Sequence, residues 1–452
     1  MMRALYSGVA GLKSHQTKMD VIGNNIANVN TVGFKAATVS FSDVLYQKTQ
    51  SASASSGNVG GINAKQIGLG TAVSSIYTDL SASGSAQNTN NTYDLMIEGS
   101  QFFIVSNAGG TYFTKVGSFT VDGVGNLVTY NGEYVMGWLP DPDDPSSIKR
   151  DIVKPLAIES DANKYADPEA TTAAYVTGNI DKLDTKLQSE DGHVMTMTIY
   201  DKQGYSYTVK MKITQDDTDT SGATYDVVVT DVVDSNNESI SDSYNITFGG
   251  TDLNATKGVK LTFDAATGKF TGIGGADKLE AMLKIEPEDD AGDVFADEIA
   301  INFENATMYS SSGSTNIAMY GGDIEGQGKG KMVGTMIGTS INTDGKIYGT
   351  YDNGDIKLLG QIAVASFANA SGLEKAGENL YIASRNSGEF DGIGEDISTS
   401  GGKINQGVIE MSNVDLSKEF TEMITTQRGF QANSRIITTS DTMLEELVNL
   451  KR

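Results

Sequence analysis

The chain has 452 residues, 38% of them hydrophobic, which is enough for about two to four compact domains with lean cores. It contains no cysteine, so disulfides and thiolate metal sites are excluded. The net charge of −25 is uneven, because residues 1–35 carry +3 and residues 412–452 carry −1. Such an acidic body repels nucleic acid and anionic membranes, whereas the near-neutral ends can pack together at little electrostatic cost. The same negative charge is equally compatible with a surface that only keeps the protein soluble.

Both ends of the chain show the hydrophobic spacing of amphipathic helices, with apolar residues at alternating steps of four and three. The N-terminal positions are Leu5, Val9, Leu12, Met19 and Ile26, and the C-terminal positions are Phe420, Met423, Phe430, Ile437 and Leu444. We predict that the two helices pair as a coiled coil and that these residues form a buried assembly seam. From spacing alone, an ordinary surface helix packed on its own domain is equally compatible.

The body of the chain has the pattern of β-structure. Short apolar runs at 95–97, 102–105 and 119–121 are broken by Gly, Asn and Asp. Four dipeptides suit tight hairpin turns, namely Asp122-Gly123, Asn131-Gly132, Asp344-Gly345 and Asn353-Gly354. Two of them precede and two follow a region whose own strands alternate strictly, at 194–200 and 205–213. One β domain is therefore expected to be inserted into another.

The predicted fold is mainly β with long α-helical termini, and it contains two nested sandwich-like or barrel-like β domains. We divide the chain into a helical domain of residues 1–35 plus 412–452, an extended connector at 36–90, a β domain of 91–165 plus 310–411, and an inserted outer β domain at 166–309. The connector is assigned from residues 49–75, which are rich in Ser, Ala, Gly and Asn and poor in apolar side chains.

The sequence offers little catalytic or metal-binding chemistry. His15 and His193 are the only histidines, which argues against zinc sites and histidine-based triads. Residues 326–331 resemble a phosphate loop but lack its spacing and its magnesium-binding hydroxyl. We therefore expect no catalytic, cofactor-binding or metal site. The chain does not begin with a basic segment followed by an apolar one, so a cleaved signal peptide is not expected. Its apolar runs are all much shorter than the ~20 residues that span a bilayer, so a membrane span is not expected either.

The amino-acid sequences of the two ends resemble those of the bacterial flagellar rod and hook family of axial proteins. The N-terminal part of this motif includes Asn25, Asn28, Asn30, Gly33 and Phe34, and the C-terminal part includes Asn413, Val414, Gln427 and Asn433. Segments 344–354 and 359–367 are more similar to the hook branch than to the rod branch. One departure is Phe430, where family members commonly carry tyrosine.

The resemblance implies a structural, non-enzymatic, extracellular subunit that polymerises with itself into a curved tube, a universal joint that transmits motor torque. It also implies contact with the distal rod below and the hook–filament junction proteins above, and with a hook cap and the type III export apparatus during assembly. No nucleic acid or membrane partner is implied. A distal rod or hook-associated relative remains an alternative, and a secreted glycan-binding adhesin would explain the β body but not the helical ends.

Overall fold

The computed structural model describes residues 2–55, 57, 60–219, 221–275, 277–288 and 294–450. They fall into two compact units. The first unit comprises Met1–Asn163, Thr339–Gly349 and Lys357–Arg452, and the second comprises Lys164–Gly338 and Thr350–Ile356. The predicted fold class is confirmed, since the protein is mainly β, its terminal helices α1 and α2 are in contact, and one β unit interrupts the other.

The first unit contains both helices and most of the short strands. Its elements are α1 (Met2–Ala27), β1 (Ala37–Asp43), β2 (Tyr46–Gln50), β3 (Lys65–Gly68), β4 (Thr71–Thr78), β5 (Ala86–Asn88), β6 (Leu95–Glu98), β7 (Phe102–Asn107), β8 (Gly110–Thr114), β9 (Phe119–Val121), β10 (Leu127–Thr129), β11 (Tyr134–Trp138), β12 (Lys154–Pro155), β27 (Ile356–Ile362), β28 (Val364–Ala365), η1 (Ala370–Gly372), β29 (Glu374–Gly377), β30 (Leu380–Ile382), β31 (Lys403–Gln406), β32 (Val408–Glu410) and α2 (Leu416–Asn449).

The second unit is built from longer strands. Its elements are β13 (Tyr165–Ala166), β14 (Ala173–Asn179), β15 (His193–Tyr200), β16 (Ser206–Gln215), β17 (Thr224–Val233), β18 (Tyr244–Phe248), β19 (Thr251–Asp252), β20 (Val259–Phe263), β21 (Phe270–Ile273), β22 (Glu280–Pro287), β23 (Ile299–Thr307) and β24 (Ala318–Gly321). Strands β25 (Gly334–Ile341) and β26 (Lys346–Tyr351) contain residues of both units, and so does β27, whose first residue, Ile356, belongs to the second unit.

Residues from both halves of the chain interleave in the first unit. β5 pairs with β32, β6 with β31, and β11 with both β7 and β27. The core beneath these strands includes Phe102, Phe113, Trp138 and Tyr381, all at most 2% exposed. The pairings of β5 with β32, β6 with β31 and β11 with β27 each join an early strand to a late one, so both halves of the chain build this unit.

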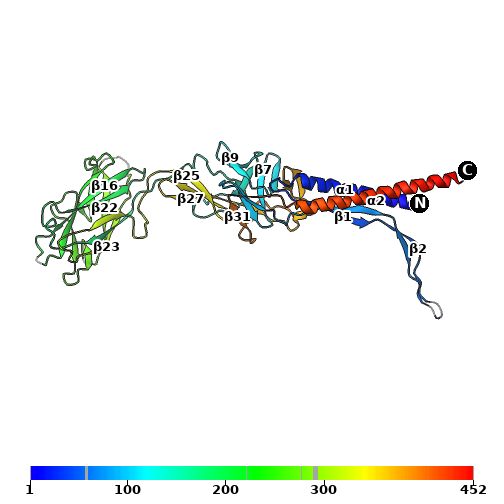
Figure 1. Ribbon diagram of the computed structural model, residues 1–452. Coiled ribbons are helices and arrows are strands. Elements are labelled where there is room, and N and C mark those ends of the chain that lie inside the picture. The colour runs from blue at the N-terminus through cyan, green and yellow to red at the C-terminus, as the bar shows by residue number, and fades with distance from the viewer. Residues whose placement is uncertain are drawn as a thin grey trace. The chain divides into compact units, whose positions relative to one another are not determined.

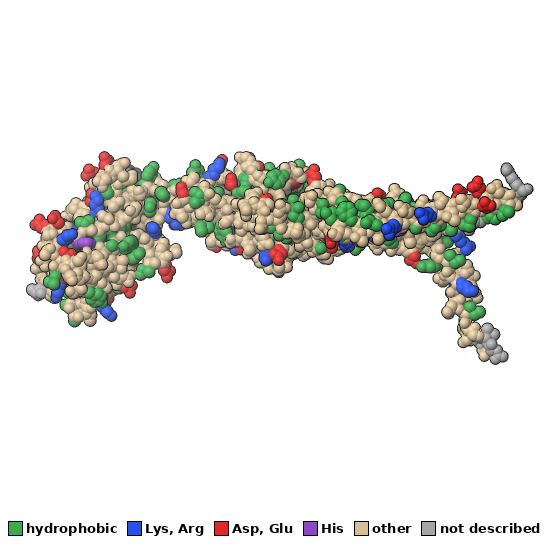
Figure 2. Space-filling view, in the orientation of Figure 1, with side chains coloured by type: hydrophobic (Ala, Val, Ile, Leu, Met, Phe, Trp, Pro, Cys, Tyr) green, Lys and Arg blue, Asp and Glu red, His purple; other side chains and the backbone are tan. Residues whose placement is uncertain are grey.

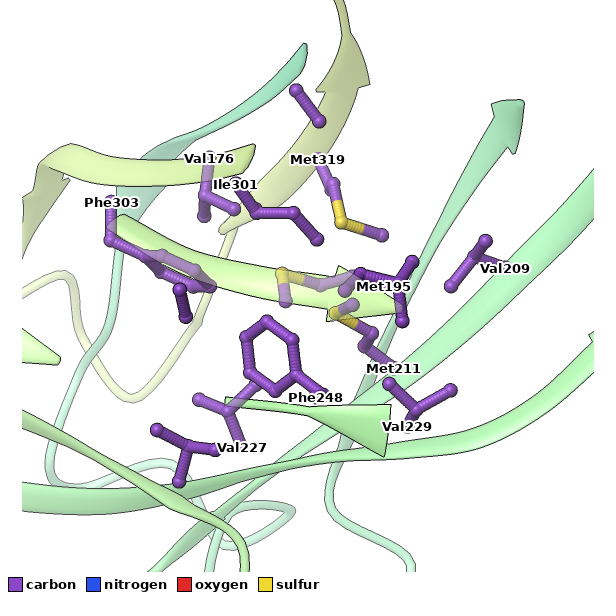
Figure 3. Close-up of a cluster of buried hydrophobic side chains, with 14 of the residues drawn as sticks. Val176, Met195, Val209, Met211, Val227, Val229, Phe248, Ile301, Phe303 and Met319 are labelled. Atoms are coloured by element: carbon purple, nitrogen blue, oxygen red, sulfur yellow. The ribbon is translucent and has the colours of Figure 1, made fainter. Parts of the chain in front are cut away.

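The second unit is a two-sheet sandwich. A five-stranded sheet with order β15-β16-β17-β20-β21 faces a six-stranded sheet with order β19-β18-β22-β23-β14-β24. Alternate residues of β15 and β16 point inward, as their sequence pattern predicts, so that Met195, Val209 and Met211 meet Ile301 and Phe303 from the other sheet (Figure 3).

Two stretches differ in detail from their sequence-based assignment. Residues 310–338 belong to the second unit, because β24 pairs with β14 at Met319 and Val176 and completes the six-stranded sheet. The connector at 36–90 forms antiparallel strands, β1 with β4 and β2 with β3, instead of a plain extended segment. Its residues 56, 58 and 59 lie outside the described ranges.

Neither helix of the described ranges combines the length and apolar character needed to cross a membrane. In the first unit, α1 and α2 lie side by side, and the strand β2 leaves the helix pair as part of a slender ribbon (Figure 1).

Replacing Phe303 by alanine should destabilise the second unit, because this fully buried ring lies between the two sheets. We expect the free energy of unfolding to fall by about 3–5 kcal/mol in denaturant titrations. Val194→Ala is the control, since Val194 is 53% exposed on β15, and it should change stability by no more than about 0.5 kcal/mol. Equal effects of the two variants would contradict the assignment of the core.

Candidate functional site at the terminal helices

Small residues let α1 and α2 approach closely along an antiparallel seam. A Cβ atom added to Gly8 would lie 3.3 Å from Ile437, and one added to Gly11 would lie 2.6 Å from the Asn433 amide. A Cβ atom added to Gly429 of α2 would lie 2.8 Å from the His15 ring of α1. The missing side chains therefore make room for a partner from the opposite helix at each of these levels.

Polar pairs continue the seam towards the β-structure. Lys18 forms an ion pair with Glu422 at 3.0 Å, and the Asn25 amide donates to a Glu419 carboxylate oxygen at 3.2 Å. Burial raises the pKa of Glu419, and the hydrogen bond from Asn25 opposes that shift. Asp415 caps the start of α2 by accepting hydrogen bonds from the backbone amides of Ser417 and Lys418.

The seam on α2 follows two sets of positions, each repeating every seven residues. One set, Met423, Phe430, Ile437 and Leu444, is half-buried and coincides with predicted seam residues. The other set consists of Glu419, Thr426, Asn433 and Ser440, which are buried or half-buried. The predicted seam residue Phe420 lies one position after Glu419 and is exposed, so it does not belong to this second set. All four of these positions carry polar side chains, and Glu419 accepts a hydrogen bond from Asn25 of α1.

On α1, the predicted residues Leu5, Leu12, Met19 and Ile26 are half-buried. Val9 is 54% exposed and Phe420 of α2 is 49% exposed. The single chain thus leaves two of the predicted seam residues open, and the burial of all ten in an assembly stays a prediction.

Large apolar side chains collect on the outside of the helix pair. These outer apolar residues are Met2, Tyr6, Val9, Leu416, Phe420, Ile424, Ile436, Met443 and Leu447, each at least 39% exposed. On α1 they recur at spacings of four and three. On α2 they form two groups with internal spacings of four or seven, Leu416, Phe420 and Ile424 in the first and Ile436, Met443 and Leu447 in the second, so that the members of each group share a face. Hydrophobic side chains are visible on the surface of both helices in Figure 2.

Asn25 and Asn28 shape the end of α1. Asn25 is 1% exposed, and its side chain both donates to the carbonyl and accepts from the amide of Ala37, at 2.8 and 3.0 Å. The Asn28 amide donates to the Asn24 carbonyl at 2.9 Å, and its oxygen accepts from the Thr31 hydroxyl. The two side chains therefore end the helix and direct the chain into β1.

The N-terminal and C-terminal motifs meet directly. The Asn413 side chain accepts from the Ala36 amide at 2.7 Å and donates to the Asp79 carbonyl at 3.1 Å. Gly33 has a φ of +67°, donates its amide to the Glu410 carbonyl, and lies so close to Val116 that an added Cβ would be 2.8 Å from that side chain. Only glycine fits there without strain.

The remaining motif residues have simpler environments. Phe34 is buried, with the Lys375 ammonium 5.4 Å from its ring centroid. Val414 and Asn433 are half-buried, whereas Asn30 and Gln427 are exposed.

A buried ion pair next to these motifs was not predicted. Lys35 and Glu410 are each 1% exposed, and their charged groups are 2.7 Å apart although 375 positions separate them in sequence. The Lys35 ammonium also donates to the Ala82 carbonyl, and the Gly84 amide donates to Glu410, both at 2.7 Å. The pair therefore ties the start of the connector, its end and the strand before α2 to one another. Hydrophobic patterning gives no signal for such a pair.

Lys115 lies near this ion pair and donates to the Gly99 carbonyl at 2.8 Å. Burial, together with the positive charge of Lys35, lowers the pKa of Lys115 to about 8, and the charge of Glu410 opposes the shift. Among the described residues, no three His, Cys, Asp or Glu side chains gather in a way that could hold a metal ion.

Four family models match the chain. The flagella basal body rod protein model matches residues 5–35, and the model for the C-terminal region of the flagellar basal body rod FlgEFG proteins matches 405–450. The model of the flagellar hook protein FlgE/F/G D1 domain matches residues 96–166, and that of the flagellar basal body protein FlaE D2 domain matches 163–322.

Curated relatives align with the whole chain. The flagellar hook protein FlgE of Treponema pallidum is 36% identical and that of Borreliella burgdorferi is 34% identical, with 100% of both chains covered in each case. The flagellar basal-body rod protein FlgG of Bacillus subtilis is 29% identical, again over 100% of both chains. The similarity therefore includes both helices and both β units.

Gly429→Ala should loosen the helix pair, because the new methyl group would overlap the His15 ring. We expect a net destabilisation of about 1–3 kcal/mol, although alanine itself favours helix by about 1 kcal/mol. Thermal melting followed by circular dichroism at the helix band measures this effect. Gly23→Ala is the matched control, since no atom lies within 4 Å of its added Cβ, and it should raise the stability. A stabilising Gly429→Ala would contradict the seam.

Lys115→Met should remove a pH dependence of stability. Because the folded chain holds the pKa of Lys115 near 8, below the ordinary 10.5, the unfolded chain binds more protons between these values. The stability of the wild type relative to Lys115→Met should therefore rise from pH 8 to 10, by up to about 1.4 kcal/mol per pH unit. Denaturant titrations at pH 8, 9 and 10 test this, and a constant difference between the two proteins would refute it.

Proposed function

Because the chain belongs to the flagellar hook protein family, we propose that it polymerises through its paired terminal helices, with the outer apolar residues as the contact between copies. It is a structural subunit of the hook, the extracellular part of the flagellum, and its family is not enzymatic. The resemblance to the rod and hook family is thereby confirmed.

The observation that carries this proposal is that large apolar side chains stay exposed on the outside of the helix pair while glycines lie inside it. Gly8, Gly11 and Gly429 lie inside the pair, whereas Phe420 and Ile424 lie outside it at 49% and 52% exposure. A helix pair that only had to be stable by itself would place its large apolar residues inside. Burying each such side chain against another copy would contribute about 1.5–3 kcal/mol.

The predicted assembly seam fits within this proposal. Its half-buried member Ile437 already packs over Gly8 of α1, whereas Val9 and Phe420 are exposed and can meet a second copy. In the polymer all ten residues would be covered, and the helix pairs would form the inner wall of the tube.

The connector would supply a second contact between copies. Leu45, Tyr46, Ile62 and Ile67 of the β2–β3 ribbon and its flanks are each at least 45% exposed. A two-stranded ribbon with no further layer is only marginally stable in water. We therefore assign 36–90 a bracing role against neighbouring subunits, where its apolar side chains would be buried.

The two β domains would form the layers outside the helical wall, with the inserted domain outermost. A curved tube that rotates as a universal joint requires strong inner contacts and weak outer ones. The acidic body, with −27 of the charge outside residues 1–35 and 412–452, suits weak and hydrated outer contacts.

Subunits at either end of such a polymer leave their outer apolar residues uncovered. The same helix pair would therefore engage the distal rod below and the hook–filament junction proteins above, because those contacts replace a missing copy. During assembly, the hook cap would cover the growing end after the type III export apparatus has delivered each chain.

Phe420→Asp should prevent polymerisation while the monomer stays folded, because Phe420 is exposed in the single chain and would be buried only between copies. Loss of one buried aromatic contact should raise the critical concentration for tube formation at least about tenfold. Sedimentation and negative-stain electron microscopy measure assembly, and circular dichroism checks the fold.

Thr421→Asp is the matched control, since it adds the same charge at the next exposed position of α2. It should assemble like the wild type. Normal tubes from Phe420→Asp, or equal loss of tubes in both variants, would refute the proposed contact.

A further inference from the structure

Two tyrosine rings are stacked on the outer face of the six-stranded sheet in the second unit. Tyr175 of β14 and Tyr320 of β24 are direct partners in the antiparallel pairing of these strands. Their ring centroids are 5.5 Å apart, and the ring planes are inclined by 25°. Both side chains point away from the core, because the neighbouring residues Val176 and Met319 occupy the inward positions and are buried.

Solvent reaches this pair of rings. Tyr320 is 50% exposed and Tyr175 is half-buried. On the other side of Tyr175, the partner position of β23 is Asn302, so the aromatic neighbour of Tyr175 across the sheet is Tyr320. Other tyrosines of the second unit stand alone, since Tyr165 and Tyr205 are 57% and 64% exposed but contact no described ring.

Neighbouring tyrosines can undergo an oxidative coupling that a solitary tyrosine cannot undergo within one chain. A one-electron oxidant removes an electron and the hydroxyl proton from each phenol, which leaves two phenoxyl radicals with unpaired density on the ring carbons beside the oxygen. Two of these carbons form a C–C bond, and the hydrogen that each of them carries moves to its phenol oxygen. With hydrogen peroxide as the oxidant, two tyrosines and one H₂O₂ give one dityrosine and two H₂O. The exposed Tyr320 ring has space to turn, so the ring edges can meet.

The composition of the chain directs one-electron oxidation to its tyrosines. The sequence contains no cysteine, and its one tryptophan, Trp138, is 1% exposed. Methionine is oxidised to the sulfoxide by transfer of an oxygen atom and forms no cross-link in that reaction. Because the chain cannot form a disulfide, a covalent link made by oxidation has to use other side chains.

We propose that Tyr175 and Tyr320 are a site of oxidative cross-linking, where a dityrosine bond fastens β24 to β14. Strand β24 is the last strand at one end of the six-stranded sheet, and the chain between the two tyrosines contains β15 to β23. The bond would restrict this long segment in the unfolded state, as a disulfide does, and so stabilise the folded second unit. Hook-family proteins are extracellular, where peroxide is not countered by the reducing interior of the cell.

The test uses the full-length chain at low concentration, treated with a peroxidase and hydrogen peroxide. Size-exclusion chromatography isolates monomers, so that links between copies are set aside. Dityrosine fluorescence measures the product, and mass spectrometry of peptides locates it. Tyr175→Phe and Tyr320→Phe keep the stacked rings but lack the phenol oxygen. Tyr205→Phe is the matched control, since it removes an accessible tyrosine of the same unit that has no ring partner among the described residues.

We expect the oxidised wild-type monomer to yield linked peptides that contain both Tyr175 and Tyr320 and are lighter by two hydrogen atoms. Tyr175→Phe and Tyr320→Phe should lose most of the fluorescence, whereas Tyr205→Phe should keep it. Oxidation should raise the denaturant midpoint of the second unit in the wild type and in Tyr205→Phe alone. Links between other tyrosines in their place, equal fluorescence from Tyr320→Phe, or an unchanged midpoint in the linked chain would overturn the proposal.

This proposal stands apart from the proposed function, because both rings belong to one chain and the reaction is measured in monomers. A chain that forms no tubes would count against the proposed contact between copies and not against the tyrosine site. Circular dichroism checks that each variant is folded. If Tyr320→Phe does not fold, the linked peptides of the oxidised wild type decide, since their masses identify the two coupled tyrosines without any variant.

Discussion

The close approach of α1 and α2 at Gly8, Gly11 and Gly429 is the constraint on which the rest of the first unit depends. Where the helices come this close, each glycine accommodates a larger side chain of the opposite helix, Ile437 over Gly8 and His15 over Gly429, and small polar residues such as Thr426 are buried beside them. Other large apolar residues, such as Phe420 and Ile424, lie on the outside of the pair. In the proposed function, these exposed side chains contribute their hydrophobic free energy to the polymer instead of to the isolated chain.

The helix pair is useful only if it is held firmly to the β-structure, and the motif residues provide that attachment. Asn25 and Asn413 each satisfy backbone groups of neighbouring segments, and the Lys35–Glu410 pair adds a charge-assisted bond where no water can screen it. Buried charge pairs contribute little net stability but are costly to break. Their value here is positional, since they admit one arrangement of the three segments that meet at this point.

Much of this arrangement could be predicted from hydrophobic spacing and turn residues. The helices at both ends, the strands of the sandwich and the nesting of one β unit in the other follow from local patterns. The burial of Glu419 in place of the neighbouring Phe420 did not, because hydrophobic spacing gives no signal for a carboxylate that is buried against the opposite helix. Residues 310–338 were assigned to the other β domain because a strand such as β24 is recruited by distant pairing with β14. The Lys35–Glu410 pair arises from tertiary proximity and has no local signal.

The antiparallel pairing of the two terminal helices also sets the order of folding. The contact of Asn25 with Glu419 closes a loop of nearly the whole chain. The entropic cost of closing a loop increases with its length, so this contact costs more entropy than the local pairings between strands. Topologies dominated by such distant contacts fold slowly, and local strands form first. The sandwich strands can therefore pair while α1 has no partner, and the glycine-lined face of α1 is occupied only once α2 is present. Under the proposed function, a fragment that ends before α2 lacks the helix pair and therefore cannot compete for a place in the polymer.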